Sequence, residues 1–544
     1  MIRKLPVICF VLFACLFAGS ASLYADAPSE YAESLGQLAS AGYSEKADIV
    51  RKLAVSQQPG AKAVLTALLA GNLYLRSSDS KLFIVVEADG NYQLTDAQTL
   101  QPAGSAASDG FEKIGTNNQL RKAVRNAIAQ FDLNSSDVKT RLAAVKEMTR
   151  SLDEDSAALM RARLDTETNS SVRVLIETSL AIVDLDSSDA EKRLIAVQSL
   201  KGNMSADVYN RLTALTVQNS DGSFAEPDER VRVAARNTLV GIEHWRTTYG
   251  AGQTMFFGLS LGAVLVLSAI GLAITFGVMG VINMAHGELM MLGAYTTYVV
   301  QLLMPNHIGA SILVAIPAAF IVSGLVGILI ERGLVRFLYG RPLETLLATF
   351  GVSLLLQQIV RDLFSANNRP VITPEWLAGS WQLNDAFAVT YNRLYVILFT
   401  GLVFAALLLV LKRTTLGLNV RAVAQNRAMA RAMGVRSEWV DAMTFGLGSG
   451  IAGIAGVALS QLTNVGPNLG QQYIVDSFMV VVFGGVGSLW GTLISGMSLG
   501  VINKLLEPYS GAVLAKIFVL IFLILFIQRR PRGLFPQKGR AAES

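Results

Sequence analysis

The apolar residues of this chain are concentrated in its second half. Forty-one consecutive residues, Thr247 to Gly287, contain no Asp, Glu, Lys or Arg. One helix needs roughly 20 apolar residues to cross a membrane, so this stretch can hold two crossings. Residues 28 to about 245 instead mix many charged and hydroxyl residues with short apolar blocks. The pattern predicts a polar first part joined to a membrane-embedded second part, with the junction at Glu243 to Gly250.

Uncharged blocks and helix breakers predict nine membrane-crossing helices in the second part. They cover about residues 255–278, 284–304, 309–330, 343–363, 394–411, 441–461, 473–487, 489–505 and 511–528. The seventh and eighth blocks are short and are joined by little more than GGVGSLWG, so one of them can be re-entrant. The predicted fold is therefore all-α: a polytopic membrane protein of about nine helices, preceded by a mainly helical domain.

The N-terminus has the pattern of a secretory signal peptide. Two basic residues precede an apolar stretch, and small residues follow it at two alternative cleavage sites, one ending at Ala21 and one at Ala27. Both cysteines of the chain lie in this segment, so the processed chain is expected to have no disulfide and no cysteine-bound metal. The predicted divisions are a signal peptide (1–27), an exported domain (28–245) and a membrane domain (246–544).

The exported domain is predicted to be mainly helical and to contain an internal repeat. DLNSSDVKTRLAAV, starting at Asp132, recurs as DLDSSDAEKRLIAV, starting at Asp184. Ser or Asp oxygens of each SSD tripeptide can cap a first helix, and an arginine-bearing second helix follows, so we predict HEAT-type helical hairpins. Two ordinary amphipathic helices without a repeat origin are the alternative. Residues 82–97 predict two strands around a turn at Asp89-Gly90-Asn91, and residues 104–110 predict a loop.

The distribution of basic residues predicts the orientation of the membrane domain. The net charge of +5 is also compatible with a nucleic-acid-binding patch, but no aromatic residues are interleaved with the basic ones. Basic residues instead gather between alternate apolar blocks, as the positive-inside tendency expects of cytoplasmic segments. These residues are Arg332, Arg336, Arg341, Lys412, Arg413, Arg421, Arg427, Arg431, Arg436, Arg529, Arg530, Arg532, Lys538 and Arg540. An exported first domain and nine crossings then place the C-terminus in the cytoplasm.

The segment GVINMAHGE, residues 280–288, carries three candidates for a translocation path: Asn283, His286 and Glu288. Such side chains are costly against lipid, so they should face protein or a wet cavity. If this segment is helical, Asn283 and His286 share one face. Asn and neutral His both donate and accept hydrogen bonds, which suits a neutral or zwitterionic solute. The alternative is that these residues cap a broken helix or bond to a neighbouring helix.

Two further polar residues lie at membrane depth, Gln357 in the fourth predicted crossing and Asp476 in the seventh. They complete the set of path candidates, although a structural salt bridge or an interfacial position is the alternative for Asp476. An intramembrane enzyme is not supported, because His286 and Glu288 lie two residues apart and no HExxH pattern is present. We therefore predict no catalytic residue and no metal site.

Residues 412–441, between the fifth and sixth predicted crossings, are basic and alanine-rich. This segment is expected to be cytoplasmic and partly helical. Its Ala and Met positions form a compact apolar face suited to docking a partner protein. A role in orienting the protein alone is the alternative.

Five ordered motifs resemble those of permeases from branched-chain amino-acid ABC importers. They are GVINMAHGELMMLGAY, ERGLVRFLYGRPLETLLATFGVSLLLQ, TTLGLNVRAVAQNRAMARAMGV, FGGVGSLWGTLISG and RRPRGLF, and the resemblance covers residues 250–536. It implies an inner-membrane assembly with a second permease subunit, cytoplasmic ABC ATPases and a periplasmic substrate-binding protein. The chain has no GxxxxGK[ST] phosphate-binding loop, so ATP is expected on partner subunits and no cofactor in this chain.

The resemblance also implies which residues couple the chain to the ATPases. AMARAMG, residues 428–434, loosely matches the coupling motif of these permeases, but Ala428 stands where the better-known version has Glu. The coupling candidates are Arg421, Asn426, Arg427, Ala428, Arg431 and Gly434. The long exported extension resembles the B-type permease subunits of urea ABC transporters, which implies urea as the solute. Branched-chain or other amino acids and amides are the alternative solutes, and a passive channel is an alternative of another class.

Overall fold

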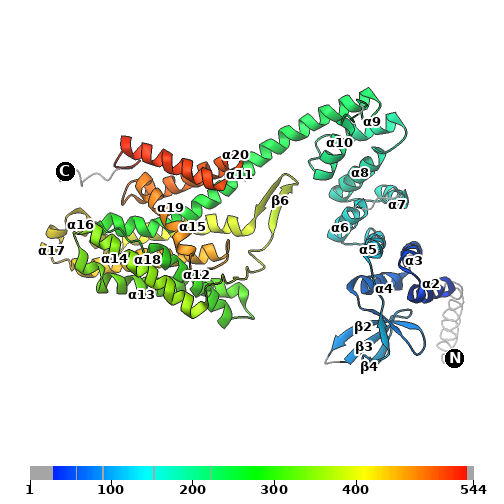
Figure 1. The fold of residues 1–544 in the computed structure, drawn as a ribbon, viewed down its shortest axis with the longest axis horizontal. Coiled ribbons are helices and arrows are strands. Elements are labelled where there is room, and N and C mark those ends of the chain that lie inside the picture. Colours follow the sequence, from blue (N-terminus) through cyan, green and yellow to red (C-terminus); the bar gives the residue numbers. More distant parts are fainter. Residues whose placement is uncertain (1–27, 57, 89–90, 151–153, 221, 536–544) are drawn as a thin grey trace, which may run out of the picture. The chain divides into compact units, whose positions relative to one another are not determined.

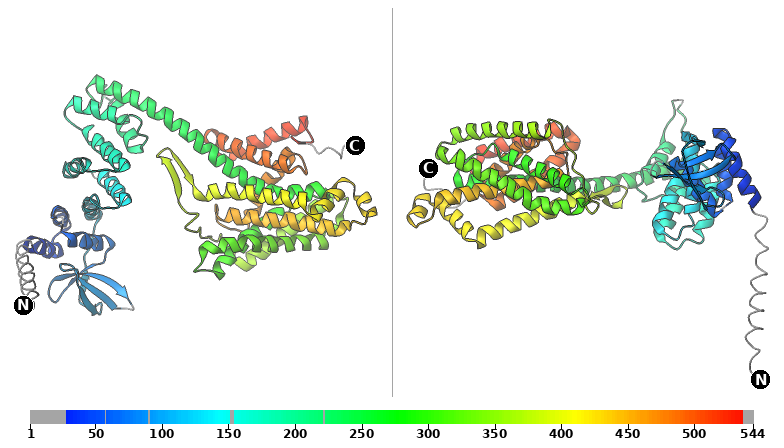
Figure 2. Two further views of the ribbon diagram at one scale, coloured as in Figure 1. Left: turned by 180° about the vertical axis from the view of Figure 1, so that it is seen from behind. Right: turned by 90° about the horizontal axis from the view of Figure 1, so that it is seen from below.

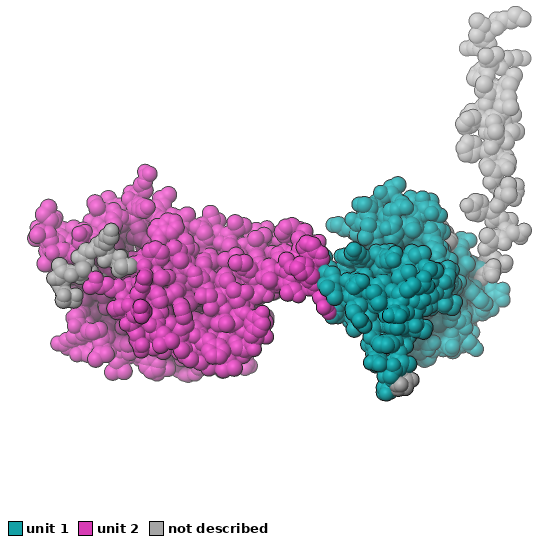
Figure 3. Space-filling model, turned by 90° about the horizontal axis from the view of Figure 1, so that it is seen from above, with its two compact units in different colours: residues 1–242 teal, residues 243–544 magenta. Residues whose placement is uncertain are grey.

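The computed structural model describes residues 28–535 except 57, 89–90, 151–153 and 221, so the predicted signal peptide lies outside the described residues. The chain divides into two compact units, one up to Ile242 and one from Glu243 onward (Figure 3). Helix α11, Glu229–Met279, is continuous across this division. The change from polar to apolar composition therefore takes place within one helix.

The N-terminal unit begins with three helices and an antiparallel sheet. The helices are α2 (Pro28–Ser40), α3 (Tyr43–Val55) and α4 (Pro59–Ala70), and the strands are β1 (Leu73–Arg76), β2 (Lys81–Ala88), β3 (Asn91–Asp96), β4 (Pro102–Ala106) and β5 (Phe111–Lys113). The strand order is β4-β3-β2-β1-β5. The pairing of β2 with β3 confirms the predicted strand pair. The loop predicted at residues 104–110 is wrong at its start, because β4 pairs with β3 despite its weak strand propensity.

A helical stack follows the sheet (Figure 1). Its helices are α5 (Asn118–Asp132), α6 (Val138–Thr149), α7 (Glu154–Leu164), α8 (Ser170–Asp184), α9 (Ala190–Ser199) and α10 (Ala206–Thr216). Asp137 and Asp189, the Asp residues of the two SSD tripeptides, cap α6 and α9. A third helix, α7 or α10, stands between the two helices predicted for each unit, so the two-helix description is incomplete. Assignment to the HEAT class stays a prediction.

The repeat positions two buried ion pairs in the same way. Arg141 makes two hydrogen bonds to the Glu167 carboxylate, each of 2.9 Å, and a third to the Ser135 carbonyl at 2.8 Å. Arg193 bonds to Glu226 at 2.8 and 2.7 Å. Its third bond goes to the carbonyl of the corresponding repeat serine. Each pair therefore ties the capped first helix of its repeat to the segment that leads into the last helix.

The first prediction concerns acid stability of the N-terminal unit. Burial alone would raise the pKa of Glu167, but hydrogen bonds from Arg141, Asn169 and Arg163 lower this pKa from 4.5 to about 2. Because the folded pKa is depressed, the stabilisation is complete above the unfolded value and is lost as the pH falls through about 2. Glu167→Gln should therefore lower hydrogen-exchange protection of α6 and α8 at pH 7 and flatten its loss between pH 4.5 and 2.

A matched control is Glu147→Gln, which removes two surface ion pairs, one with Arg150 and one with Arg125. Surface pairs contribute about 0–1 kcal/mol, whereas breaking a buried pair costs about 3–5 kcal/mol. Equal loss of protection in the two variants would contradict a special role for the buried pair.

The second unit is a bundle of long helices, which Figures 1 and 2 show packed side by side. After α11 come α12 (His286–Leu303), α13 (Ile308–Gly333), a 3-10 turn η1 (Val335–Leu338), α14 (Pro342–Phe364), the hairpin β6 (Ser380–Asn384) and β7 (Phe387–Thr390), α15 (Tyr391–Arg413), α16 (Thr415–Gln425), α17 (Arg427–Ala432), α18 (Ser437–Ser460), α19 (Leu469–Gly484) and α20 (Leu489–Arg529). The predicted helical, polytopic fold with a helical N-terminal region is confirmed.

The number of crossings stays a prediction. Each of the nine predicted segments contains helix, and α20 holds the last two, separated by a kink at Gly511. Among the described residues, six helices are long and apolar enough to cross a membrane. Helices α12 and α19 are not among these six.

Helix α18 lies at the centre of this bundle and packs against α12 and α13. Glycines make this packing possible. A Cβ added to Gly293 of α12 would overlap the main chain of Gly453 in α18, and one added to Gly456 would overlap the main chain at Met290. These glycines therefore have a packing role, because only a residue without a side chain permits such close approach of helix backbones.

Candidate functional site

The polar segment after α11 forms a break between two helices. Helix α11 ends at Met279 and α12 begins only at His286. Gly280 opens the break with a φ of +68°, a left-handed conformation that glycine adopts without steric cost. Asn283 therefore lies outside the helix, and the idea that it shares a helical face with His286 is wrong. Asn283 does not cap α12 either, because the N-cap residue is Ala285, and the Asn283 side chain bonds within the break itself.

Side chains satisfy the main chain of this break. Thr349 of α14 accepts a hydrogen bond from the Met284 N–H at 3.1 Å, and its hydroxyl oxygen lies 3.4 Å from the Ile282 carbonyl. The Asn283 Oδ1 accepts from the N–H of Ala285 at 3.0 Å. Non-helical main chain at membrane depth is tolerated only where it is buried in protein or lines a water-filled cavity. Thr349 was not predicted, because the sequence does not reveal which helix the fourth apolar block faces.

The first three residues of α12 contact three different helices. His286 Nε2 donates to the carbonyl of Ser268 in α11 at 2.8 Å. Gly287 packs against the first turn of α19, where an added Cβ would lie 2.5 Å from a main-chain oxygen. Glu288 Oε1 accepts from Nε2 of Gln357 in α14 at 2.6 Å. Successive residues of a helix point about 100° apart, so one turn of α12 can be surrounded by three neighbours.

This arrangement places the start of α12 inside the helical bundle. Ser268 lies about three helical turns before the end of α11. The break after Met279 therefore runs back alongside α11, and it brings His286 next to Ser268. The first N–H groups of a helix have no partner within the helix, and they carry a partial positive charge. A buried polar helix end therefore lies beside the middle of the apolar helix α11.

Amide groups link the buried Glu288 to the surface of the bundle. The Glu288 and Gln357 residues are 1% and 3% exposed. Gln357 Nε2 also lies 3.4 Å from Ser353 Oγ, and Gln357 Oε1 accepts from Nε2 of the exposed Gln471 at 3.4 Å. Gln471, which was not predicted, belongs to the first turn of α19. The chain of contacts thus runs from a buried carboxyl group through two amides to the surface.

Near this series of hydrogen bonds, two buried atoms have no hydrogen-bond partner among the described residues: Asn283 Nδ2 and His286 Nδ1. Because the Ser268 carbonyl can only accept, the proton of the neutral imidazole is on Nε2 and Nδ1 is an acceptor. Buried polar groups are rarely left unpaired. One donor and one acceptor are therefore available here to water or to a small polar solute.

Asp476 does not join this cluster. Its carboxylate pairs with Lys516 of α20 at 3.0 Å, and its side chain is 12% exposed. This geometry matches the salt-bridge alternative for Asp476. In the described part of the chain, no three or more His, Cys, Asp or Glu side chains are grouped to hold a metal ion.

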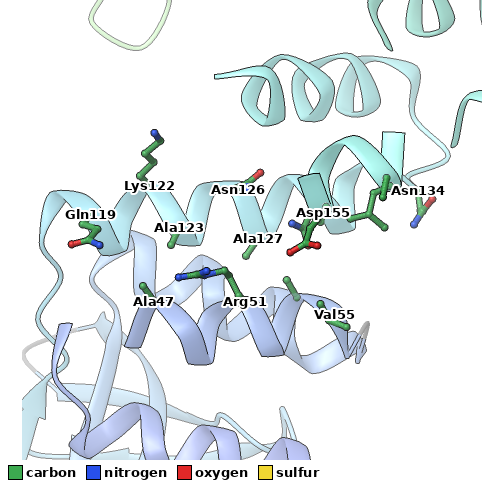
Figure 4. Close-up of a pocket in the computed structure, with 14 residues that line it drawn as sticks. Ala47, Arg51, Val55, Gln119, Lys122, Ala123, Asn126, Ala127, Asn134 and Asp155 are labelled. Atoms are coloured by element: carbon green, nitrogen blue, oxygen red, sulfur yellow. The ribbon is translucent and has the colours of Figure 1, made fainter. Parts of the chain in front are cut away.

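The largest of the described cavities, about 720 Å³, lies in the N-terminal unit between α3, α5 and α7. Figure 4 shows Ala47 and Arg51 of α3 facing Ala123 and Ala127 of α5 across it. Amide side chains, including Asn126, line its α5 side. These groups have no arrangement that performs chemistry, so the polar end of α12 remains the stronger candidate site.

The coupling candidates lie on two short helices between α15 and α18. Arg421 of α16 donates to the carbonyl of Leu411 in the last turn of α15. Asn426 caps α17 by accepting from the Met429 N–H at 2.9 Å. Gly434 ends this region with a φ of +86°. The predicted partly helical segment is therefore present as α16 and α17.

Arg427 is directed into the bundle rather than toward solvent. Its guanidinium donates to the Asp441 carboxylate, which is buried in the first turns of α18. The same guanidinium lies 4.2 Å from the ring centroid of Tyr339, between η1 and α14. Burial raises the pKa of Tyr339 to about 12, although Arg427 acts in the opposite direction, so the ring stays neutral beneath the cation. Arg427 thus fixes α17 to two other segments.

Exposed apolar side chains cover the outer surface of the same region. Met429 and Met433 are 61% and 79% exposed, and Ala428 beside them is exposed as well. Arg431 is also exposed, and its Nε donates to Ser437 Oγ at 2.6 Å. Adaptable methionine side chains are common at protein-binding surfaces. The arrangement offers an apolar docking face bordered by basic residues.

The second prediction tests the inward role of Arg427. Arg427→Gln leaves the Asp441 charge buried without its partner, which should destabilise the α17–α18 contact by about 2 kcal/mol. This value lies below that for a fully buried pair, because Arg427 is 30% exposed. Hydrogen exchange of the α17 and α18 amides measures the effect.

Asp441→Asn added to Arg427→Gln should restore most of the protection, because it removes the unpaired charge. The exposed Arg436→Gln serves as the control and should leave protection unchanged. A double variant no more protected than Arg427→Gln alone would exclude this pairing as the source of the effect.

Comparison with known proteins yields one family. A family model described as the permease component of the branched-chain amino acid transport system matches residues 254–527. The high-affinity branched-chain amino acid transport system permease protein LivH of Salmonella typhimurium is 31% identical over 293 residues, covering 52% of this chain and 94% of LivH. The corresponding permease protein BraD of Pseudomonas aeruginosa is 30% identical over 292 residues, with the same two coverages.

More distant similarity extends to a sugar permease. The ribose import permease protein RbsC of Escherichia coli is 25% identical over 264 residues, covering 46% of this chain and 77% of RbsC. No solved structure matches the chain. The matched family region contains the break after α11 and the α16–α17 segment, and it leaves the N-terminal helices and sheet outside.

Proposed function

This chain belongs to the family of branched-chain amino acid transport permease components, and on that premise we propose that it is the membrane permease subunit of an ATP-driven ABC importer. Its proposed partners are a second permease subunit, cytoplasmic ABC ATPases and a periplasmic substrate-binding protein. The observation that carries the proposal is the polar first turn of α12, held inside an apolar bundle in the region that the family shares. ATP is bound and hydrolysed by the partner subunits.

The proposed mechanism is alternating access. ATP binding and hydrolysis move the ATPases, which dock on the exposed face of α16 and α17. The Arg427–Asp441 pair transmits this movement to α18, and α18 packs directly on α12. The bundle then opens first toward the binding protein and afterwards toward the cytoplasm. The chain itself contributes the solute path and carries out no chemical step.

Urea is the solute that we propose. Among the described residues, Glu288 accepts a hydrogen bond from the Gln357 amide and pairs with no Lys or Arg. The site therefore already holds a carboxylate that accepts from an amide N–H. Urea presents amide N–H groups and one carbonyl, and it can take the place of the Gln357 amide on Glu288. The unpaired Asn283 Nδ2 and His286 Nδ1 offer one donor and one acceptor for the same solute.

Branched-chain amino acids, the solutes in the names of LivH and BraD, are the competing class. An ionised leucine brings an ammonium, a carboxylate and an apolar side chain, and its carboxylate needs a cationic or dipolar partner. The first N–H groups of α12 can supply a dipolar one. The N-terminal unit favours urea, because this extension resembles that of urea-transporting permeases and lies outside the range of the family model.

The proposed location is the bacterial inner membrane. The N-terminal unit lies in the periplasm and the C-terminus in the cytoplasm, as the clusters of basic residues favour. In this orientation, α16 and α17 face the cytoplasm, where the ATPases bind. The exposed Gln471 lies on the periplasmic half, where a binding protein would release its solute.

The third prediction is the transport activity itself. The chain, assembled with its partner subunits and binding protein in lipid vesicles, should accumulate labelled urea when ATP is supplied and not when ADP replaces it. Labelled leucine measured in parallel distinguishes the two solute classes. Leucine uptake without urea uptake would exclude urea, and uptake without ATP would exclude an importer in favour of a passive channel.

The fourth prediction assigns the solute contact to Glu288. Glu288→Leu removes the carboxylate that accepts from the amide, which should lower ATP-driven urea uptake about tenfold or more, as expected for a lost charged hydrogen bond of 1.5–3 kcal/mol. Asp476→Asn changes a carboxylate outside the cluster and should leave uptake within about twofold of wild type.

Melting temperatures of both purified variants show whether they are folded, and Glu288→Gln provides a second, isosteric variant. Unchanged urea uptake by folded Glu288→Leu would remove this residue from the path without affecting the importer assignment.

A further inference from the structure

A cleft of about 280 Å³ opens between α11, α15, α16 and α20, beside the break after α11. Its walls are apolar or small, and they include Ile274 and Val278 of α11, Leu408 of α15 and Leu489 of α20. Two cationic side chains, Lys412 and Arg421, complete the lining. The cleft therefore combines an apolar interior with a basic edge.

The basic edge has unused binding capacity. Neither Lys412 nor Arg421 has a carboxylate within ion-pair distance among the described residues, and the same holds for Arg413. Arg421 donates one bond to the Leu411 carbonyl, which holds the guanidinium at the C-terminal end of α15. A guanidinium has five N–H donors, so most of them stay available to an anion. Helix capping alone thus does not account for the three cations.

Aromatic and aliphatic side chains continue from this cleft along the outside of the bundle. Trp490 lines the cleft, is 54% exposed and packs edge-on against Phe404 of α15 at a centroid distance of 5.3 Å. Ile494, one turn further along α20, is 41% exposed on the same face. Tryptophan is enriched where the hydrocarbon core meets the headgroups. The cleft therefore lies at the depth of a membrane interface.

We propose that this cleft binds an anionic phospholipid, with its phosphate on Lys412 and Arg421 and part of one acyl chain against Ile274, Val278 and Leu408. The proposal rests on the proposed membrane orientation, which places these cations in the cytoplasmic leaflet. That leaflet carries anionic lipids, and basic pockets between membrane helices on this side bind their headgroups. The lipid would join the end of α11 to α16, and so would stabilise the contact between the helix break and the coupling segment.

The test uses the full-length chain purified in detergent and native mass spectrometry to count bound lipids. Phosphatidylglycerol should bind to wild type and bind about tenfold or more weakly to Lys412→Gln/Arg421→Gln, because each basic residue near an anionic lipid surface contributes about one kcal/mol. The matched control is Arg529→Gln/Arg530→Gln, which removes two basic residues at the end of α20 and should retain wild-type binding. Equal weakening by both double variants would overturn the assignment to this cleft.

Two further arms identify the ligand. Phosphatidylcholine should bind far more weakly than phosphatidylglycerol, and equal binding would overturn recognition by charge. Glycerol phosphate at the same concentration should not displace the lipid, and displacement would show that a free phosphate is sufficient. Loss of the bound lipid when the partner subunits are added would show that the cleft is a protein interface instead.

Melting temperatures in the presence of phosphatidylcholine show whether the variants are folded. Apolar Leu408→Gln within the cleft provides a second variant that keeps both cations and should also weaken lipid binding; unchanged binding would exclude the acyl chain from the cleft. Lipid binding is measured without transport. Its outcome is therefore independent of whether the uptake experiment succeeds or fails.

Discussion

The structure depends on one constraint: a helix that begins inside a membrane must have its polar main chain satisfied there. The break after Met279 meets this constraint with few residues. Thr349 accepts a hydrogen bond from the Met284 N–H, and the Asn283 side chain accepts one from the N–H of Ala285. His286 completes the arrangement by reaching the Ser268 carbonyl. Without these contacts, several unpaired polar groups would be buried in an apolar bundle. Each such group would raise the free energy of the folded state by several kcal/mol.

The same constraint explains why glycines surround the break. A polar helix start can be satisfied by neighbouring helices only if their backbones come close, and bulky side chains would keep them apart. Gly287 allows α19 to approach α12, and Gly271 leaves room beside α11 for both the Gly448 carbonyl of α18 and the His286 ring. The glycines are therefore part of the polar site as much as of the packing. The N-terminal unit connects its helices differently. There, the ion pairs Arg141–Glu167 and Arg193–Glu226 join neighbouring segments of the helical stack.

The sequence was sufficient to locate the helices of the membrane unit, but not to predict which helices contact one another. Apolar blocks located all nine helical segments, because burial in lipid requires long uncharged runs. His286, Glu288 and Gln357 were recognised as costly polar residues, and they do cluster. Ser268, Thr349 and Gln471 were missed, because serine, threonine and a terminal glutamine carry little penalty and periodicity does not tell which helix faces which. Strand β4 was missed because only its pairing with β3 stabilises it.

Movement at the surface can reach the buried polar site only through elements that do not bend easily. Helix α18 has this property: its first turns hold Asp441, which pairs with Arg427 of α17, and its middle packs on α12 with the two main chains in close contact at glycines. A close-packed contact transmits displacement because it has no space to absorb it. The Gly448 carbonyl lies beside Gly271, which also touches the His286 ring. A shift of α18 would therefore move a main-chain oxygen that packs against Gly271, next to the His286 ring at the polar start of α12.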